Sequence, residues 1–431
     1  MPHDELTAAQ TAVIDALDEQ ALVDDLVDLV RVPSITGSDA ESELQGRLSH
    51  RLSGLGLDVD HWALDLDALA ADPDHPGIES ERSEGWGLVG TSEGEGEVAL
   101  VLQGHSDVVP TGDLGLWSAG GPFSREIRGD VLHGRGACDM KAGVAVNLAV
   151  ATALVRSGVT LTRRFALHHV ISEEDGGLGA FATLRRGHRG EVAVITEPTS
   201  GHLVVANAGA LTFTLHVEGR AAHGSTRAEG VSALEAFWPV HTAIRALEER
   251  RNADRPAAFG DNPLPFGISI GRIRAGDWSS SVPDALTAEG RYGVRLGEDV
   301  EEARTAFEEA VADACAADPW LRSHPVRVEW TGGQFASGAL EGALEGGHPL
   351  VDEVRAAIAL TAGRQAALAA APYGSDLRLY TGLGGIPTLH YGPGDVRFAH
   401  APREQVSISE TIEVARALAA MAALRLTRPA D

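Results

Sequence analysis

Val98-Ala-Leu-Val-Leu-Gln103 runs directly into Gly104-His105-Ser106-Asp107, and this junction decides the fold class. The first run is short and apolar without alternation, which is typical of a strand buried on both faces of a sheet. Two further apolar runs, at residues 164–171 and 192–195, and two helix-like segments, at 142–157 and 179–186, follow it. Buried strands that alternate with helices predict an α/β domain with a mostly parallel sheet and helices on both faces.

The pattern changes beyond residue 205, where alternating strands and longer helices replace the buried runs. Strands are expected at 211–218, 267–273, 286–294 and 326–330, and helices at 231–251 and 300–317. This order is that of a compact α+β, ferredoxin-like domain. The α/β pattern resumes with a helix at 350–361, and 431 residues exceed what one hydrophobic core usually supports. We therefore predict one domain over residues 1–205 and 333–431, interrupted by a second over residues 206–332.

The composition argues against several classes of partner. With 35 basic and 62 acidic side chains the net charge is −27, and such a surface repels nucleic-acid phosphates and anionic lipids. Two cysteines are too few for a disulfide framework. The first residues lack a signal-peptide pattern, and the longest apolar stretch, residues 142–155, is too short to span a bilayer. We therefore expect a soluble, cytoplasmic protein with no nucleic-acid or membrane partner.

Potential metal ligands gather in four short segments, each at a strand end or the start of a helix. These segments are residues 103–110, 134–143, 171–176 and 195–199. In an open α/β sheet, ligands bind outside the carboxyl ends of the strands, so we expect the four segments to converge on one crevice. Imidazole together with carboxylates suits zinc, cobalt or manganese.

The spacing within these segments suggests distinct tasks. In His105-Ser106-Asp107, the carboxylate can accept a proton from the second ring nitrogen and so orient a metal-binding imidazole. Of two adjacent glutamates, Glu173 and Glu174, one can bind metal while the other serves as a general base. Taken singly, a histidine is more often structural and such glutamates more often form a solvated turn. These glutamates, however, leave a strand expected to be buried, where carboxylates need partners.

The motifs extend through nearly the whole chain. They are GHSDVVP at 104–110, HGRGACDMKAG at 133–143, SEEDGG at 172–177, TEPT at 196–199, AHAPRE at 399–404 and, in the inserted domain, GRAAHGS at 219–225 and WSSSVP at 278–283. This ordered set resembles the M20 metallopeptidase and amidohydrolase family. The family includes acetylornithine deacetylase, succinyl-diaminopimelate desuccinylase, aminoacylase and carboxypeptidase G.

The resemblance implies a site for two divalent metal ions, with zinc expected and cobalt or manganese as alternatives. Asp139 would bridge both ions. His105 and Glu197 would complete one ion's ligands, and Glu174 and His400 would complete the other's. The peptide bond after Asp139 is expected to be cis by the same analogy.

The resemblance also assigns the catalytic groups. Glu173 would be the general base for a metal-held hydroxide that attacks an amide carbonyl. Asp107 would orient His105. His223, on the inserted lid domain, would donate to the oxyanion in the site of a partner subunit. The implied assembly is therefore a homodimer through the inserted domain.

Substrate recognition is less sharply marked. Arg291, with Arg295 as the alternative, matches an arginine that holds a substrate carboxylate, and Gly374 and Ser375 match a substrate loop. The run at 278–283 lacks the commoner asparagine before Val-Pro, which leaves the substrate open.

We expect an acetylornithine deacetylase-like amidohydrolase that cleaves a small N-acyl amino acid. The alternatives are a carboxypeptidase or dipeptidase acting on short peptides, a succinyl-diaminopimelate desuccinylase, a formylpyrimidine deformylase and, more remotely, a non-catalytic binding relative. No predicted ligand or base is missing, which argues against the last.

Two other catalytic motifs are rejected. Gly90-Thr-Ser92-Glu-Gly94 fits the serine-hydrolase pattern G-x-S-x-G, but a strand rather than a helix is expected to follow Ser92. A phosphate-binding loop is excluded because the only lysine, Lys141, follows Met140 instead of a glycine.

Overall fold

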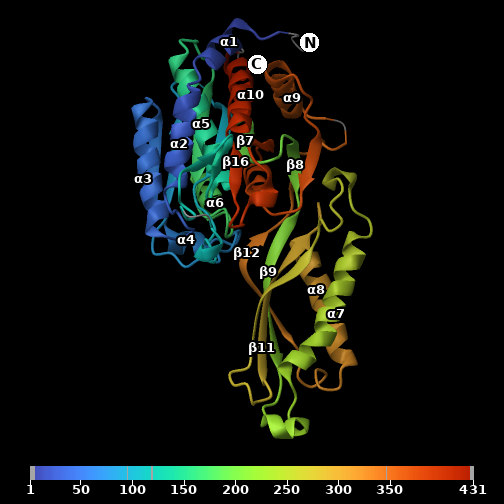
Figure 1. The fold of residues 1–431 in the computed structure, drawn as a ribbon. Helices are drawn as coiled ribbons and strands as arrows, with labels where there is room; N and C mark the ends of the chain where they lie inside the picture. Colours follow the sequence, from blue (N-terminus) through green and yellow to red (C-terminus); the bar gives the residue numbers. More distant parts are fainter. Residues whose placement is uncertain (1–4, 95, 118–119, 346, 428–431) are drawn as a thin grey trace. The chain divides into compact units, whose positions relative to one another are not determined.

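The computed structural model describes residues 5–94, 96–117, 120–345 and 347–427. It divides into two compact units. Unit 1 comprises Met1–Ala206, Ala339–Ala369 and Asp376–Asp431, and unit 2 comprises Asn207–Gly338 and Ala370–Ser375. Figure 1 shows both units coloured along the chain. The predicted fold class, an α/β fold with an inserted α+β domain, is confirmed.

A nine-stranded sheet forms the centre of unit 1, in the order β1-β2-β6-β3-β7-β15-β8-β13, with β14 paired to β8. The middle of the sheet, from β6 through β3 and β7 to β15, is parallel. The strands are β1 Asp58–Ala63, β2 Trp86–Thr91, β3 Val98–His105, β6 Arg164–Val170, β7 Ala193–Pro198, β8 Leu203–Asn207, β13 Gly338–Ala339, β14 Leu368–Ala371 and β15 Thr388–Gly392. A small sheet joins β16 Gln405–Ser407, β5 Val131–His133 and β4 Glu126–Arg128.

Helices cover both faces of the large sheet. Leu100 and Leu102 of β3 pack in the core with α5 and α10, whereas Val101 between them packs in a second core with Phe181 of α6. The helices of the unit are α1 Ala8–Asp15, α2 Glu19–Val30, α3 Asp39–Gly54, α4 Leu66–Ala70, α5 Ala142–Arg156, α6 Leu178–Arg185, α9 Pro349–Ala362 and α10 Ile408–Thr427. The first and last of them meet, since Gln10 Nε2 donates to the carbonyl of Ala420 at 3.1 Å.

Helix α5 is long and apolar. With the π-helical segment Ala137–Lys141 it forms a 20-residue run, Ala137–Arg156, that could cross a membrane by length and composition alone. The apolar stretch considered in the sequence, residues 142–155, lies within α5, which has 15 residues, and the longer run includes Asp139 and Met140, whose backbone angles are not helical. Its most apolar window is 83% buried inside the protein, as in the core helix of a folded domain.

Unit 2 is a four-stranded antiparallel sheet in the order β10-β11-β9-β12, with two helices packed on it. The elements are β9 Gly209–Glu218, α7 Ala233–Asn252, β10 Ile268–Ala275, β11 Ala285–Val294, α8 Val300–Ala317 and β12 Arg327–Phe335. Burial alternates along β9, where Leu211, Phe213 and Leu215 enter the core beneath the helices. This is the ferredoxin-like order expected from the sequence.

Short 3₁₀ and π segments complete the description. They are Leu114–Leu116, Ala137–Lys141, Gly224–Glu229, Ala257–Phe259, Leu379–Leu383 and Val396–Phe398.

Candidate metal centre

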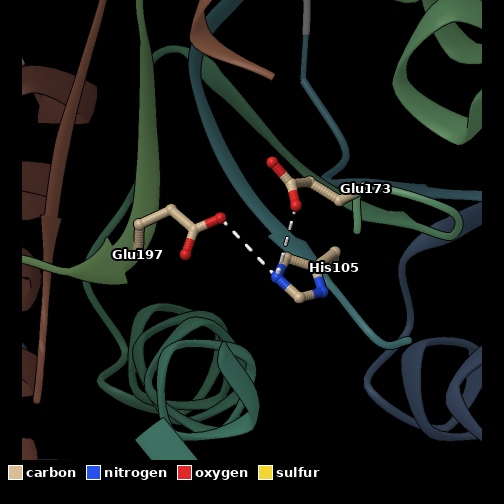
Figure 2. Close-up of side chains that lie close together, drawn as sticks. All are labelled: His105, Glu173 and Glu197. Atoms are coloured by element: carbon tan, nitrogen blue, oxygen red, sulfur yellow. Dashed lines mark ion pairs between the residues drawn. The ribbon is translucent and has the colours of Figure 1, made fainter. Parts of the chain in front are cut away.

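The predicted ligands of unit 1 come together at the carboxyl ends of adjacent parallel strands. His105 is the last residue of β3, Glu197 lies near the end of β7, and Glu173 follows β6. Because β3 pairs with both β6 and β7, these three side chains project into one space, as Figure 2 shows. The sheet therefore brings together residues that are up to 92 positions apart, since 197 − 105 = 92.

His105 lies at the centre of this cluster. Its Nε2 lies 3.1 Å from Asp139 Oδ1, 3.6 Å from Glu197 Oε1 and 4.0 Å from Glu173 Oε2. The ligand atoms form two overlapping groups that could each hold a metal ion: His105, Glu173 and Glu197, and His105, Asp139 and Glu174. Glu173 belongs to the first group, although it is farther from His105 Nε2 than Asp139 and Glu197 are.

Asp139 faces two histidines with different oxygens. Its Oδ1 is directed to His105, and its Oδ2 lies 3.4 Å from His400 Nε2. The same His400 nitrogen lies 2.9 Å from Glu174 Oε2. A carboxylate with its oxygens split between two sets of ligands is the arrangement expected of a bridging ligand. The peptide bond between Asp139 and Met140 is cis, as the resemblance implied.

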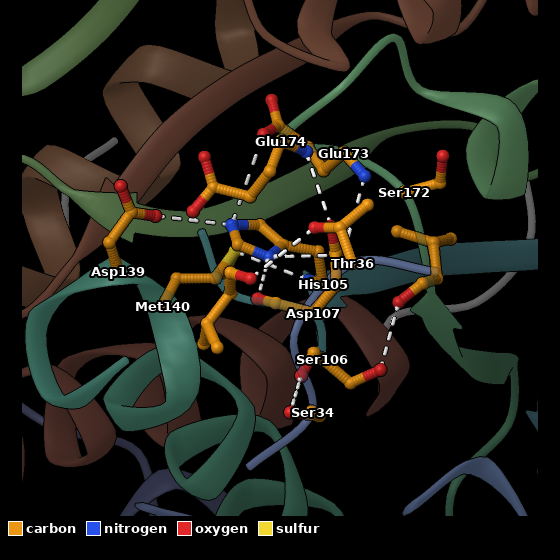
Figure 3. A network of polar contacts seen from close by, with 12 residues as sticks. Ser34, Thr36, His105, Ser106, Asp107, Asp139, Met140, Ser172, Glu173 and Glu174 are labelled. Carbon is orange, nitrogen blue, oxygen red and sulfur yellow. Dashed lines mark hydrogen bonds and ion pairs between the residues drawn. The ribbon is translucent and has the colours of Figure 1, made fainter. Parts of the chain in front are cut away.

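Asp107 anchors both His105 and the glutamate turn (Figure 3). His105 Nδ1 lies 3.0 Å from the Asp107 backbone carbonyl and 3.4 Å from Asp107 Oδ1, so the backbone oxygen is the nearer partner. The carboxylate also accepts from Thr36 Oγ1 at 2.9 Å and from the backbone N–H groups of Glu173 and Glu174 at 3.3 Å each. One buried carboxylate therefore holds the imidazole and the turn in register, a second task that the His-x-Asp spacing did not reveal.

The charges in this space fit a divalent cation. Burial, and then the neighbouring Glu197, raises the pKa of Glu173 well above its ordinary value, and burial with Asp139 does the same to the pKa of Glu197. Burial lowers the pKa of His105, but hydrogen bonds to Asp107 and Asp139 outweigh it and hold that pKa well above the ordinary value. Crowded buried carboxylates repel one another unless a cation lies among them. Carboxylate oxygens with imidazole nitrogens are ligands that zinc, cobalt and manganese accept.

Asp139 is held in place by the carboxyl-terminal part of unit 1. Glu404 accepts from the backbone N–H groups of Cys138 and Asp139, at 3.1 Å each, and from Arg135 at 2.5 Å. Glu404 belongs to the motif at 399–404, but no role was predicted for it from the sequence. The sequence signal that could have pointed to Glu404 is that this carboxylate lies in the same segment as the predicted ligand His400.

Gln103 and Arg378 are also buried, and neither was predicted to act near the glutamate turn. Gln103 donates to Asp376 Oδ2 at 2.8 Å, and Arg378 donates to the Gly176 carbonyl at 2.8 Å. Asp376 directly follows Ser375 of the predicted substrate loop. The bond from Arg378 connects the turn to the residue directly before the π segment Leu379–Leu383, and the bond from Gln103 connects β3 to Asp376.

The predicted substrate residues lie in unit 2. Arg291 is on β11 and donates to the Pro372 carbonyl at 2.9 Å, while Arg295 donates to the Asp254 carbonyl at 2.8 Å. Ser375 is buried, and a side chain at Gly374 would come within 2.6 Å of Phe335. Their role in substrate binding stays a prediction.

His223 is exposed on unit 2, directly before the 3₁₀ segment Gly224–Glu229. Its Nδ1 lies 2.7 Å from the Ser225 hydroxyl and also accepts from the Ser225 N–H. This pairing leaves Nε2 as the nitrogen that could face a ligand. Its role in the site of a partner subunit stays a prediction.

The structure also rejects a serine-hydrolase site at Ser92. Strand β2 precedes Ser92 and β3 follows it, so the helix of a nucleophile elbow is absent at this described position. Ser92 is buried, and its hydroxyl accepts the backbone N–H of Phe165 at 2.9 Å.

Comparison with known proteins agrees with this geometry. The profile of peptidase family M20/M25/M40 matches residues 101–424. The chain is 26% identical over 389 residues to an N-formyl-4-amino-5-aminomethyl-2-methylpyrimidine deformylase of Bacillus subtilis, covering 86% of each chain. It is 32% identical over 277 residues to a succinyl-diaminopimelate desuccinylase of Stenotrophomonas maltophilia, covering 61% of this chain and 65% of the relative.

Solved structures share the fold. A dipeptidase from Saccharomyces cerevisiae aligns over 100% of both chains with a TM-score of 0.77 and 14% identity. A dinuclear metal-binding M20 peptidase from Bacillus subtilis aligns over 95% of this chain and 100% of its own, with a TM-score of 0.58 and 16% identity. With its motifs, its fold and the match over residues 101–424, this chain belongs to peptidase family M20/M25/M40, whose relatives hydrolyse amide bonds.

Proposed function

We propose that this hydrolase releases the acyl group from a small N-acyl amino acid, in the manner of acetylornithine deacetylase, and needs two divalent metal ions to do so. The observation that carries the proposal is the convergence of imidazoles and carboxylates at the carboxyl ends of β3, β6 and β7. The family match supports amide hydrolysis. The choice of an amino-acid substrate rests on the resemblance of the motifs.

The donor set suits zinc, with cobalt and manganese as alternatives. His105, Asp139 and Glu197 would hold one ion, and Asp139, Glu174 and His400 the other. Bound divalent ions supply Lewis acidity and lower the pKa of a water molecule.

Glu173 is the proposed general base. Its carboxylate is buried at the edge of the cluster, 4.0 Å from His105 Nε2, and the resemblance does not require it as a ligand. Burial and the neighbouring Glu197 favour the protonated carboxyl once a proton has been taken up. Glu173 would accept the proton of the attacking water and pass it to the leaving amine.

The oxyanion donor is proposed to come from a second copy of the chain. His223 of the partner subunit would reach the site when two chains associate through unit 2. The exposed position of His223 and its free Nε2 face support this assignment.

A second candidate substrate is a formylated aminomethylpyrimidine. The similarity to the deformylase extends over 86% of both chains, further than the match to the desuccinylase. The same residues would serve, because deformylation also transfers an acyl group from nitrogen to water. Desuccinylase and dipeptidase activities share this chemistry and differ in how the substrate is held.

A hydrolysis screen tests these choices. Purified protein is supplied with zinc, cobalt or manganese and offered N-acetylornithine, other N-acetyl and N-succinyl amino acids, the formylated pyrimidine and dipeptides, with and without chelator. Chelator-sensitive release of ornithine supports the deacetylase proposal. Release of formate alone replaces the deacetylase proposal with a deformylase, and cleavage of dipeptides alone replaces it with a dipeptidase. Hydrolysis that survives complete metal removal contradicts the metal-dependent mechanism.

A further inference from the structure

The segment at residues 77–82 packs directly against the turn that carries Glu173 and Glu174. It lies in an acidic stretch, residues 65–85, that the sequence presents as a surface loop. A Cβ at Gly176 would lie 1.9 Å from the Gly77 carbonyl oxygen, so the two backbones touch at this point. The segment has no helix or strand, and its residues are exposed or half-buried, as expected of a surface loop, but its backbone contacts the turn at this point.

Asp175 ties the segment to the turn. This buried carboxylate accepts from the backbone N–H groups of Ser80, at 2.9 Å, and Glu79, at 3.3 Å. Its other oxygen accepts the hydroxyl of Ser172. Ser172 has φ 60, in the left-handed region that a serine rarely adopts, and it immediately precedes Glu173. The conformation of the turn thus depends on contacts made by residues 79 and 80.

Arg82 fixes the end of the segment in the protein interior. Its Nη1 donates to Glu41 Oε2 of α3 at 2.8 Å, and both side chains are 1% exposed. Burying an ion pair costs several kcal/mol of desolvation per ion, so such a pair is weak as a source of stability alone.

We propose that residues 77–82 are a positioning element of the metal centre, with Arg82 as its anchor: the element sets the place of the turn that carries Glu173 and Glu174. The inference rests on the proposed function, because it takes that turn to supply a metal ligand and the base. Arg82 is not one of the predicted ligands; it acts through its pair with Glu41, which holds the segment whose backbone N–H groups at residues 79 and 80 donate to Asp175.

Cobalt binding tests the inference without a substrate. Metal-free protein is titrated with Co²⁺ against a chromophoric chelator, and the visible absorption of the bound cobalt reports its coordination. The Arg82→Met variant is expected to bind at least one of the two ions about 10- to 100-fold more weakly, with an altered spectrum. Arg82→Lys, which keeps the charge, is expected to recover part of the loss.

A matched control separates positioning from general stability. Arg425 is also largely buried, and donates to the Ala99 carbonyl at the opposite end of β3 and to Glu353, at 2.8 Å each. Arg425→Met should lower the melting temperature while leaving cobalt affinity and spectrum unchanged. Should Arg82→Met fail to fold, Glu41→Gln, which removes the partner's charge and keeps its shape, takes its place and is expected to weaken cobalt binding.

The outcomes are distinct. Wild-type affinity and spectrum in folded Arg82→Met or Glu41→Gln overturn the positioning role alone. Equal weakening in Arg425→Met also overturns it, because the effect is then one of stability. A wild-type protein that binds no cobalt overturns the proposed metal centre and this inference together.

Discussion

Buried histidines of unit 1 fall into two groups with opposite electrostatics. His168 and His169, inside β6, make no hydrogen bond or ion pair with a carboxylate of the described residues, and burial lowers their pKa values to about 3 and about 4; His168 Nδ1 lies 2.8 Å from the Tyr380 hydroxyl. His105 is equally buried, yet hydrogen bonds to carboxylates raise its pKa. The same effect occurs at His400, whose side chain is 54% exposed: Glu174 raises its pKa to about 11. Burial alone therefore does not identify a metal ligand. The carboxylates that face its imidazole distinguish the predicted ligand His105 from His168 and His169.

The largest expected effect concerns the proposed base at the end of the same strand. Glu173→Ala is expected to lower kcat by about 10²- to 10⁴-fold, since the proton of the attacking water loses its acceptor. Zinc content, measured by elemental analysis, should stay near two ions per chain. As the contrasting variant, His169→Gln should keep most of the activity. An active Glu173→Ala enzyme contradicts the assignment of the base.

A third kind of histidine, exposed and on unit 2, gives the next effect. His223→Ala is expected to lower kcat by about 10²- to 10³-fold with little change in metal content, as for a lost oxyanion donor. Dimers re-formed from equal amounts of the Glu173→Ala and His223→Ala chains should regain about a quarter of wild-type activity, because one site in each mixed dimer is complete.

Light scattering reports whether the chain is dimeric, and assays of each variant alone give the baseline. No recovery on mixing, in dimers shown to exchange subunits, contradicts the placement of His223 in a partner's site. Loss of metal from His223→Ala would instead make it a ligand.

Replacing one histidine from each of the two groups gives a smaller effect. His105→Gln removes a nitrogen from the centre of the cluster and should weaken metal binding at least about 100-fold, more than loss of an outer partner costs. His168→Gln should leave metal affinity within about 3-fold of wild type, because no ligand group is lost. Competition titration with a chelator measures both. Equal metal affinities of His105→Gln and His168→Gln would contradict the distinction between the two groups of histidines.

The smallest effect is a pH dependence of stability. His168 and His169 have pKa values in the folded protein below the unfolded value of about 6.5, so between about pH 6.5 and pH 4 the unfolded chain binds more protons. Their contribution to the free energy of unfolding is therefore fully present above pH 6.5 and is lost as pH falls.

Each histidine contributes up to about 1.4 kcal/mol per pH unit in that range. Urea unfolding of wild type and His169→Gln at several pH values tests this. The free energy of unfolding of the variant should fall less steeply with decreasing pH, by up to about 1.4 kcal/mol per pH unit. Identical slopes would show that His169 is protonated without cost in the folded state.

Much of the fold and of the metal centre could be predicted from local sequence. Apolar runs mark β3, β6 and β7, and parallel strands bring their carboxyl ends to one edge, so His105, Glu173 and Glu197 could be placed together before the structure was seen. The ferredoxin-like order of unit 2 followed from alternation and helix length in the same way.

The residues that hold these ligands could not be found so readily. Arg82 and Glu41 belong to segments whose polar composition matches solvated loops and helix surfaces, and only the tertiary fold buries them together. Asp107 was recognised as a partner of His105 but not as the acceptor of two backbone N–H groups 66 and 67 residues away. Long-range contacts to the backbone leave no mark on side-chain spacing.

The packing of α1 on α10 has a consequence for synthesis. Residues 207–338 and 370–375, the whole of unit 2, leave the ribosome before α10 exists. The core of unit 1 draws on both ends of the chain, and His400 is translated after every other predicted ligand. We therefore expect unit 2 to fold before unit 1, which cannot hold both metal ions until the segment that carries His400 and α10 has been translated.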